Sequence, residues 1–238
     1  MSFIEVYDNY NNLGISARKL TLGKEYNMVN DFIDYKKELF KPKSDKQLAI
    51  FLETKINNSY PDIVFAEYNP FKFENWAEER NNIEPFDFKI LYYIYENKKI
   101  ESQKIVKDLS ITYKDLLSSL ERLLSAKLID VKNRNWYIRD KKIFGVRKIE
   151  AIEAKISKWD EVMQQALINK NFASESCVLS KINKPKQDIV NKLDSFGIGI
   201  YILSNNGFMQ INKPQKRPYP MNYNSICFNE WIGRILNN

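Results

Sequence analysis

The hydrophobic positions of this chain follow helical and strand periods in turn, and the mixture predicts an α/β protein. Residues 44–58 (SDKQLAIFLETKINN) carry apolar side chains at helical spacing behind Ser44 or Asp45, either of which can cap a helix, so we expect a helix there. These apolar positions are Leu48, Phe51, Leu52 and Ile56. After Pro61, the run DIVFAEY (62–68) is short and apolar, which predicts a strand.

Residues 84–142 differ in character and predict three helices followed by a β-hairpin. Apolar side chains recur every three or four residues in three successive segments. The expected helices lie within 85–100, 101–110 and 111–129. The segment DVKNRNWYIRDKK (130–142) predicts a hairpin with Asn133, Arg134 and Asn135 at its tip.

From residue 143 the pattern returns to strands and helices of a core. We expect a strand in IFGVRKIEAIEAKI (143–156), a helix in SKWDEVMQQALINKNFA (157–173), two buried strands, and a last strand after the turn NNG (205–207). Together with the upstream elements, this order describes an α/β core, a mixed sheet with helices on both faces, interrupted by an inserted domain. The expected boundaries are 1–83 for the first part of the core, 84–142 for the insertion and 143–238 for the second part.

The composition excludes several classes of enzyme. The chain has no histidine, which excludes mechanisms that need an imidazole base or a histidine ligand, including Ser-His-Asp hydrolases and most zinc enzymes. Its seven glycines form neither a P-loop nor a GxGxxG motif. Cys177 and Cys227 lack CxxC spacing, so neither a zinc site nor a disulfide framework is indicated. Any catalysis therefore depends on carboxylates, lysines, hydroxyls and a bound metal.

The amino-terminal residues indicate where the protein works. The stretch MSFIEVYDNYNN carries acids where a signal peptide would carry a basic flank and an apolar core. No run approaches the ~20 apolar residues of a membrane span. We therefore expect a cytoplasmic protein with no membrane partner.

The net charge of +7 favours a polyanionic partner, and the excess is concentrated in the insertion. Residues 86–142 hold 13 Lys and Arg against 8 Asp and Glu, a net charge of +5. Their order of helices and hairpin resembles a winged helix-turn-helix module, which implies DNA binding through the third helix and the wing. The residues placed on DNA by this resemblance are Lys114, Ser118, Arg122, Lys132, Arg134, Arg139 and Lys141. The alternative is a module that docks protein or is purely structural, because two acids share the outward face of the third helix.

Glu153 and Lys155 stand two apart at the end of an apolar run and suggest a catalytic strand. Residues two apart on a strand share a face, so we expect both side chains on one side, together with Ile149 and Ala151. A carboxylate there can ligate Mg²⁺, and a neighbouring lysine can position a water molecule or offset charge on a phosphate. Asp62, at the head of DIVFAEY, can supply a second carboxylate.

PDIVFAEY (61–68) and IEAIEAKI (149–156) resemble the two halves of the signature of the PD-(D/E)XK nuclease superfamily, whose members share the restriction-endonuclease-like fold. The resemblance implies that Asp62 and Glu153 hold Mg²⁺, for which Mn²⁺ can substitute, and that Lys155 is catalytic. The following segment also resembles that of several nuclease-like branches in Trp159, Gln165, Ala166, Asn169 and Phe172 to Ser176. This resemblance implies that Gln165 lies beside the metal. Glu53 is the further acid expected in the preceding helix.

One departure from the family pattern concerns the separation of the two halves. About 90 residues lie between Asp62 and Glu153, whereas the family usually has them much closer in sequence. We assign the excess to the inserted module, because a longer loop between adjacent strands costs only slightly more free energy. Without an insertion, Glu67 is a rival second ligand, although its odd offset from Asp62 directs it to the other face.

The resulting hypothesis is a metal-dependent DNA endonuclease that engages double-stranded DNA through its inserted module. Cleavage of both strands by a single site would require a homodimer or two successive nicks. The alternative is a nucleic-acid-binding regulator with a degenerate nuclease-like dimerisation domain. A third reading is an assembly subunit that binds protein through its aromatic side chains.

Overall fold

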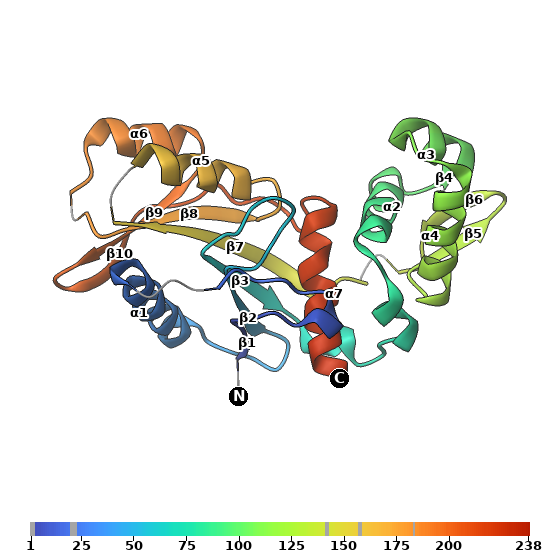
Figure 1. Cartoon of the computed structure of the whole chain (residues 1–238), viewed down its shortest axis with the longest axis horizontal. Helices are drawn as coiled ribbons and strands as arrows, with labels where there is room; N and C mark the ends of the chain where they lie inside the picture. The colour runs from blue at the N-terminus through green and yellow to red at the C-terminus, as the bar shows by residue number, and fades with distance from the viewer. Residues whose placement is uncertain (1–2, 20–22, 141–142, 157–158, 183) are drawn as a thin grey trace. The chain divides into compact units, whose positions relative to one another are not determined.

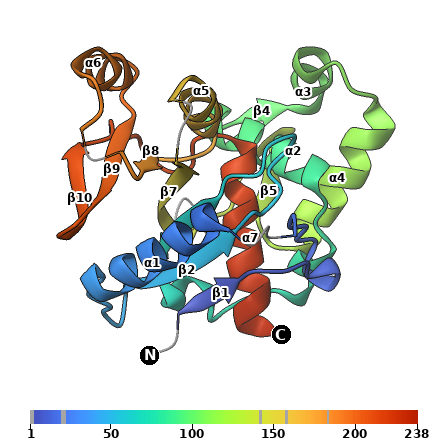
Figure 2. The same cartoon turned by 60° about the vertical axis from the view of Figure 1, so that its left-hand side comes forward.

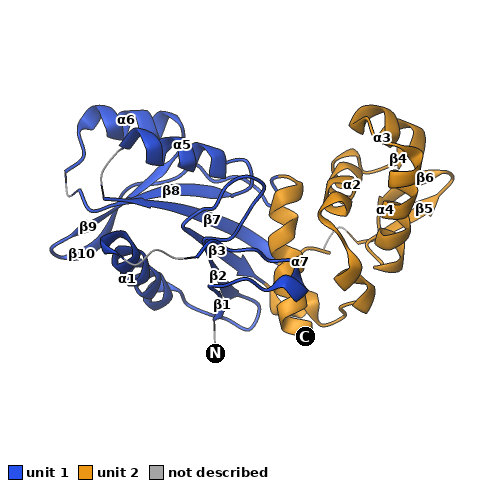
Figure 3. Ribbon diagram, in the orientation of Figure 1, with its two compact units in different colours: residues 1–68, 146–221 blue, residues 69–145, 222–238 orange. Residues whose placement is uncertain are grey.

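The protein forms two compact units, each built from separate stretches of the chain (Figure 3). The structure is a computed structural model that describes residues 3–19, 23–140, 143–156, 159–182 and 184–238. Unit 1 contains residues 1–68 and 146–221, and unit 2 contains residues 69–145 and 222–238. The chain therefore leaves unit 1 after one strand and returns to it at the start of another.

Unit 1 is built on a seven-stranded mixed sheet (Figure 1). The strand order is β1-β2-β3-β7-β8-β9-β10, so β10 is at one edge beside β9, as Figure 2 also shows. The strands are β1 (Ile4–Val6), β2 (Gln47–Leu52), β3 (Ile63–Tyr68), β7 (Val146–Lys155), β8 (Glu175–Ser180), β9 (Gly199–Ser204) and β10 (Gly207–Asn212).

The pairing of β3 with β7 determines which residues meet at the centre of this sheet. These two strands are antiparallel, whereas β7, β8 and β9 are mutually parallel. Ile63 pairs with Ile152. Asp62 directly precedes Ile63 and Glu153 directly follows Ile152, so the two acids lie level at the same end of the strand pair. The separation of about 90 residues along the chain is thus closed by strand pairing.

Helices cover both faces of the sheet in unit 1 (Figure 1). The helix α1 (Lys24–Leu39) buries Met28, Val29, Phe32 and Ile33 against residues of β2, β3, β7, β8 and β9. On the opposite face, α5 (Trp159–Asn169) and α6 (Gln187–Ser195) pack on β8 and β9. The α/β architecture expected from the sequence, with helices on both faces of a mixed sheet, is confirmed at this level.

The helix predicted over residues 44–58 is wrong, because this segment contains strand β2. Residues 48–52 are all buried, since β2 lies between β1 and β3 and is covered on both faces. A strand buried on both faces reads as a continuous apolar run, which matches helical spacing by chance over five residues. Ser44 and Asp45 therefore cap no helix, and Glu53 follows a strand.

Unit 2 has a helical part and a small sheet (Figure 3). The helices are α2 (Pro85–Asn97), α3 (Ser102–Leu109), α4 (Tyr113–Ser125) and α7 (Tyr223–Asn237), with 3₁₀ turns at Pro70–Phe73 and Glu78–Asn82. The antiparallel sheet has the order β4-β6-β5, from β4 (Ile100–Glu101), β5 (Ile129–Lys132) and β6 (Asn135–Ile138). The three helices and the hairpin expected in residues 85–142 are present, with Asn133 and Arg134 between the hairpin strands.

The composition of unit 2 differs from the predicted boundaries, because α7 and residues 69–83 and 143–145 also belong to it. An ion pair explains part of the difference. The guanidinium of Arg80 donates to both carboxylate oxygens of Glu230 in α7, at 3.0 and 2.5 Å, and both side chains are buried. Arg80 also stacks on Trp76, whose ring lies directly against Gly233, where no Cβ would fit. Such side-chain partners far apart in the sequence leave no periodic signal.

No helix in the described part of the chain is long and apolar enough to cross a membrane.

Candidate functional site

Three carboxylates meet where β2 ends and where the paired strands β3 and β7 place Asp62 beside Glu153. Glu53 comes directly after β2 and its backbone N–H donates to the Asp62 carbonyl at 3.2 Å. The charge of Asp62 raises the pKa of both Glu53 and Glu153, and the charge of Glu53 also raises the pKa of Glu153, which indicates that their side chains are close. The structure thus brings together the two acids expected from the PD-(D/E)XK signature and the third that was expected from a helix.

Asp62 is held by the backbone of β7. One of its carboxylate oxygens accepts the N–H of Ala154 at 2.6 Å. Burial raises the pKa of Asp62, while the Ala154 N–H and the Lys155 charge act in the opposite direction.

Glu153 is the most deeply enclosed of the three acids, with 2% of its surface exposed. Its Oε1 accepts the side-chain N–H of Asn169, at the end of α5, at 2.7 Å. Within the described residues, Oε2 has no hydrogen-bond partner, and neither has Oδ1 of Asn169. Burial first, and the charge of Asp62 second, raise the pKa of Glu153 well above its usual value. A buried carboxylate in this state is stabilised by any cation that reaches it.

Glu53 has an unusual backbone and a basic partner. Its φ is 47°, in the left-handed region that non-glycine residues rarely occupy, which turns its side chain back toward Asp62 at the end of β2. The Arg18 guanidinium donates to Oε2 of Glu53 at 2.6 and 2.9 Å. Burial and the charge of Asp62 nevertheless raise the pKa of Glu53 to about 7, because they outweigh Arg18.

Lys155 completes a cavity of about 260 Å³ at this end of the sheet. Its Nζ lies 3.4 Å from the carboxylate of Glu25, in the first turn of α1. The cavity is lined by Arg18, Lys19, Glu25, Tyr26, Val29, Glu53, Asp62 and Lys155. Glu153 hydrogen-bonds to Asn169 of α5, while the Lys155 amine reaches Glu25 of α1. Strand β7 pairs with β8 without a register shift through Lys155, so the expected common face of Glu153 and Lys155 stays a prediction.

The residues present fit a hard divalent cation in their chemistry. All the donors are oxygens, and one buried carboxylate oxygen of Glu153 lacks a partner among the described residues. In the same part of the chain, no group of three or more acidic or cysteine side chains forms a ready ligand cluster. Mg²⁺ usually takes one or two carboxylates and keeps its waters, so Asp62 and Glu153 are sufficient donors and Glu53 can add a third.

Two further residues, Gln165 and Glu67, were expected near the metal site or as rival ligands. Gln165 is exposed on α5, one turn before Asn169, and its predicted place beside a metal stays a prediction. Glu67 is at the opposite end of β3, where it pairs with Lys46 at 3.1 Å, so it does not share a site with Asp62. Asn169 belongs to the nuclease-like pattern of this helix, but the sequence assigned it no role, and its hydrogen bond to Glu153 was not expected.

The side chains expected to contact DNA differ in their exposure and in their ion pairs. Arg122 donates to both oxygens of Asp87, at 2.7 and 2.8 Å, and Arg139 binds Asp130 in the same bidentate way. These two guanidinium groups are therefore engaged within unit 2. The exposed members of the set are Lys114, Ser118, Lys132, Arg134 and Arg139, whereas Lys141 lies outside the described residues.

Comparisons with known proteins do not assign this chain to a family. No family model matches it, and no curated protein matches it. The crystal structure of protein VC1899 from Vibrio cholerae is similar over 58% of this chain, with 12% sequence identity and a TM-score of 0.22. The chain spans about half, 55%, of the length of that protein. A TM-score this low does not define a common fold.

Proposed function

We propose that this protein is a metal-dependent nuclease of the PD-(D/E)XK class that hydrolyses phosphodiester bonds in DNA. The observation that carries the proposal is the meeting of Asp62, Glu153 and Glu53, with Lys155 beside them, at one end of adjacent strands. Acid-X-Lys triplets are common in a chain with 28% charged residues, but this one stands beside two further, half-buried acids. Grouped acids with raised pKa values are typical of functional sites, since a fold gains no stability from them.

Each residue has a definite task in this proposal. Asp62 and Glu153 would hold Mg²⁺, or Mn²⁺ in its place, and Glu53 would join them when Arg18 moves away. The ion, when bound, lowers the pKa of a water molecule and offsets charge on the phosphate. Lys155 orients the attacking water and neutralises charge that develops on the phosphoryl oxygens. Asn169 fixes the rotamer of Glu153 through its 2.7 Å hydrogen bond.

We further propose that unit 2 is a winged helix that brings DNA to the nuclease. Support comes from the order helix, short strand, helix, helix, two-stranded hairpin over α2 to β6, and from the net charge of +5 in residues 86–142. Lys132 and Arg134, at the hairpin turn, together with Lys114 and Ser118 on α4, are exposed and can contact phosphates. Arg122 is held by Asp87, so we assign it a structural role.

The test is cleavage of supercoiled plasmid and of single-stranded DNA in Mg²⁺ and in Mn²⁺. The variants Glu153→Gln and Lys155→Gln should reduce cleavage by at least about a hundredfold, because each removes a group at the reacting phosphate. Matched controls are Asp194→Asn and Lys181→Gln, which remove the same charges from exposed positions of unit 1. Equal cleavage by the Glu153 and Lys155 variants, with the wild-type circular dichroism spectrum, would refute the assignment.

A second candidate function is a DNA-binding regulator with a degenerate nuclease site. The observation that favours it is the ion pair between Arg18 and Glu53, which occupies one of the three acids. This candidate predicts DNA binding that persists in EDTA and no cleavage in either metal.

A further inference from the structure

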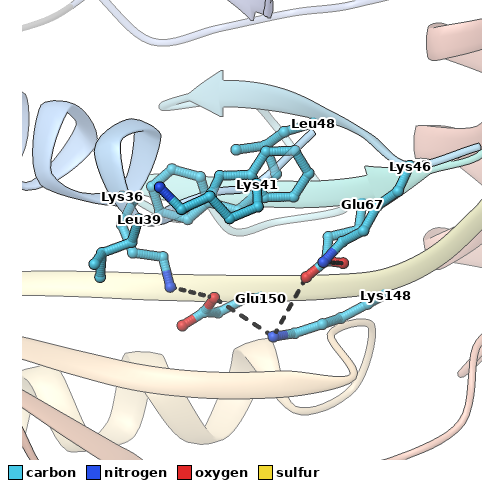
Figure 4. A pocket seen from close by; sticks show the side chains of 10 residues that line it. Lys36, Leu39, Lys41, Lys46, Leu48, Glu67, Lys148 and Glu150 are labelled. Atoms are coloured by element: carbon cyan, nitrogen blue, oxygen red, sulfur yellow. Dashed lines mark hydrogen bonds and ion pairs between the residues drawn. The ribbon is translucent and has the colours of Figure 1, made fainter. Parts of the chain in front are cut away.

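Unit 1 has a second cavity, of about 270 Å³, near the carboxyl end of α1 (Figure 4). Its charged lining consists of Lys36, Lys41, Lys46, Lys148, Glu67 and Glu150. These residues come from α1, from the loop that follows it, and from strands β3 and β7. None of them lines the cavity of the candidate nuclease site.

The carboxylates of this cavity already have cationic partners. Glu150 is buried, and its Oε2 accepts from Lys36 Nζ at 2.7 Å while Oε1 accepts from the Tyr201 hydroxyl at 3.2 Å. Burial opposes ionisation, but the charges of Lys36 and Lys148 prevail and lower the pKa of Glu150. Lys148 also binds the carboxylate of Glu175 at 2.7 Å. The floor of the cavity is therefore a neutralised network that offers no charge to a cation.

The rim of the cavity carries the excess positive charge. Lys46 has a partner in Glu67, at 3.1 Å, and its amine lies 4.9 Å from the centre of the Phe40 ring. Lys41 is exposed, and no ion pair or hydrogen bond among the described residues involves it. Four lysines thus face three carboxylates, those of Glu67, Glu150 and Glu175, which leaves one uncompensated cation beside the opening.

The remaining lining is apolar. It consists of Leu39, Phe40, Leu48 and Phe65. Lys36 Nζ lies 5.3 Å from the centre of the Phe65 ring, so cationic and aromatic groups alternate along the wall. A ligand that fills this space needs an anionic group at the lysines and a flat apolar part against the rings.

We propose that this cavity binds a small phosphate monoester with a planar ring, of the nucleoside monophosphate class. The phosphate binds the amines of Lys41 and Lys46, and Lys46 leaves its ion pair with Glu67 to do so. The ring packs on Phe40 and Leu48. Point charges on flexible stems suit a phosphate group, which accepts from several directions. The proposal is independent of the nuclease function, since it uses none of the same residues.

The test is isothermal titration of the full chain with adenosine 5′-monophosphate, inorganic phosphate and adenosine in separate runs. The nucleotide should bind, and the two fragments should each bind at least about tenfold more weakly, because each meets only half of the site. The double variant Lys41→Gln/Lys46→Gln should also lose at least about tenfold in affinity. Lys43→Gln is the matched control, because it removes the same charge from the same loop outside the cavity lining.

Each other outcome would overturn the proposal. Absence of nucleotide binding at millimolar concentration, or unchanged affinity in the double variant with its wild-type melting temperature, excludes the site. Inorganic phosphate that binds as tightly as the nucleotide excludes the ring contact. A double variant that loses affinity for a single-stranded oligonucleotide, in a protein that binds no mononucleotide, would assign these lysines to a nucleic acid backbone instead.

Discussion

The substitution Glu53→Gln should remove a large pH dependence from the stability of the protein. Glu53 has a folded-state pKa of about 7, against 4.5 for an ordinary glutamate. The folded chain therefore binds more protons than the unfolded chain between these two values. The contribution of Glu53 to the unfolding free energy is therefore greatest below pH 4.5, and it is lost as the pH rises through 7. The amide of glutamine has no proton to lose and abolishes this contribution.

The magnitude follows from the two pKa values. One pKa unit corresponds to about 1.4 kcal/mol, so ionisation of Glu53 costs about 3 kcal/mol of unfolding free energy at pH 8. The Glu53 side chain is only 13% exposed, so solvent screens this cost weakly. Arg18 loses a charged partner in the variant, but its side chain is 56% exposed and the loss is small. Glu53→Gln should therefore be more stable than wild type at pH 8.

The assay is urea unfolding at a series of pH values between 4.5 and 8, with and without millimolar Mg²⁺. Wild type should lose about 3 kcal/mol more than Glu53→Gln across this range, and Mg²⁺ should recover part of the loss in wild type. The control Glu25→Gln removes a charge from a half-exposed position of the same cavity and should behave like wild type. Parallel pH curves for wild type and Glu53→Gln would refute the reasoning.

Two further substitutions test contacts on which the two units depend. Arg80→Met leaves the carboxylate of Glu230 buried without its cation and should cost about 3 to 5 kcal/mol in chemical unfolding, whereas adding Glu230→Met should recover most of that loss. A double variant no more stable than the single one would contradict this account. Asn169→Ala removes the donor to Glu153 and should cost about 1 to 3 kcal/mol, and it should weaken cleavage through a lower affinity for Mg²⁺. Unchanged Mg²⁺ dependence in that variant would limit Asn169 to a structural role.

The amino-acid sequence determined much of the local structure. Periodic leucines and isoleucines specify α2, α3 and α4, because their spacing places them on one apolar face of each helix. The alternation and length of β7, and the apolar run of β3, likewise specify strands. The pairing of Asp62 with Glu153 was expected because the two segments resemble the halves of one known signature, since apolar periodicity alone does not say which strands are neighbours.

The tertiary structure alone decided the remaining features. Strand β2 could not be distinguished from a helix, since burial on both faces comes from neighbours that lie elsewhere in the chain. The place of α7 in unit 2 could not be read from the sequence either, because it depends on the buried ion pair between Arg80 and Glu230. Asn169 became the partner of Glu153 only through the packing of α5 on the sheet. Local periods record which face of an element is apolar, whereas partners at long range depend on the three-dimensional arrangement of elements.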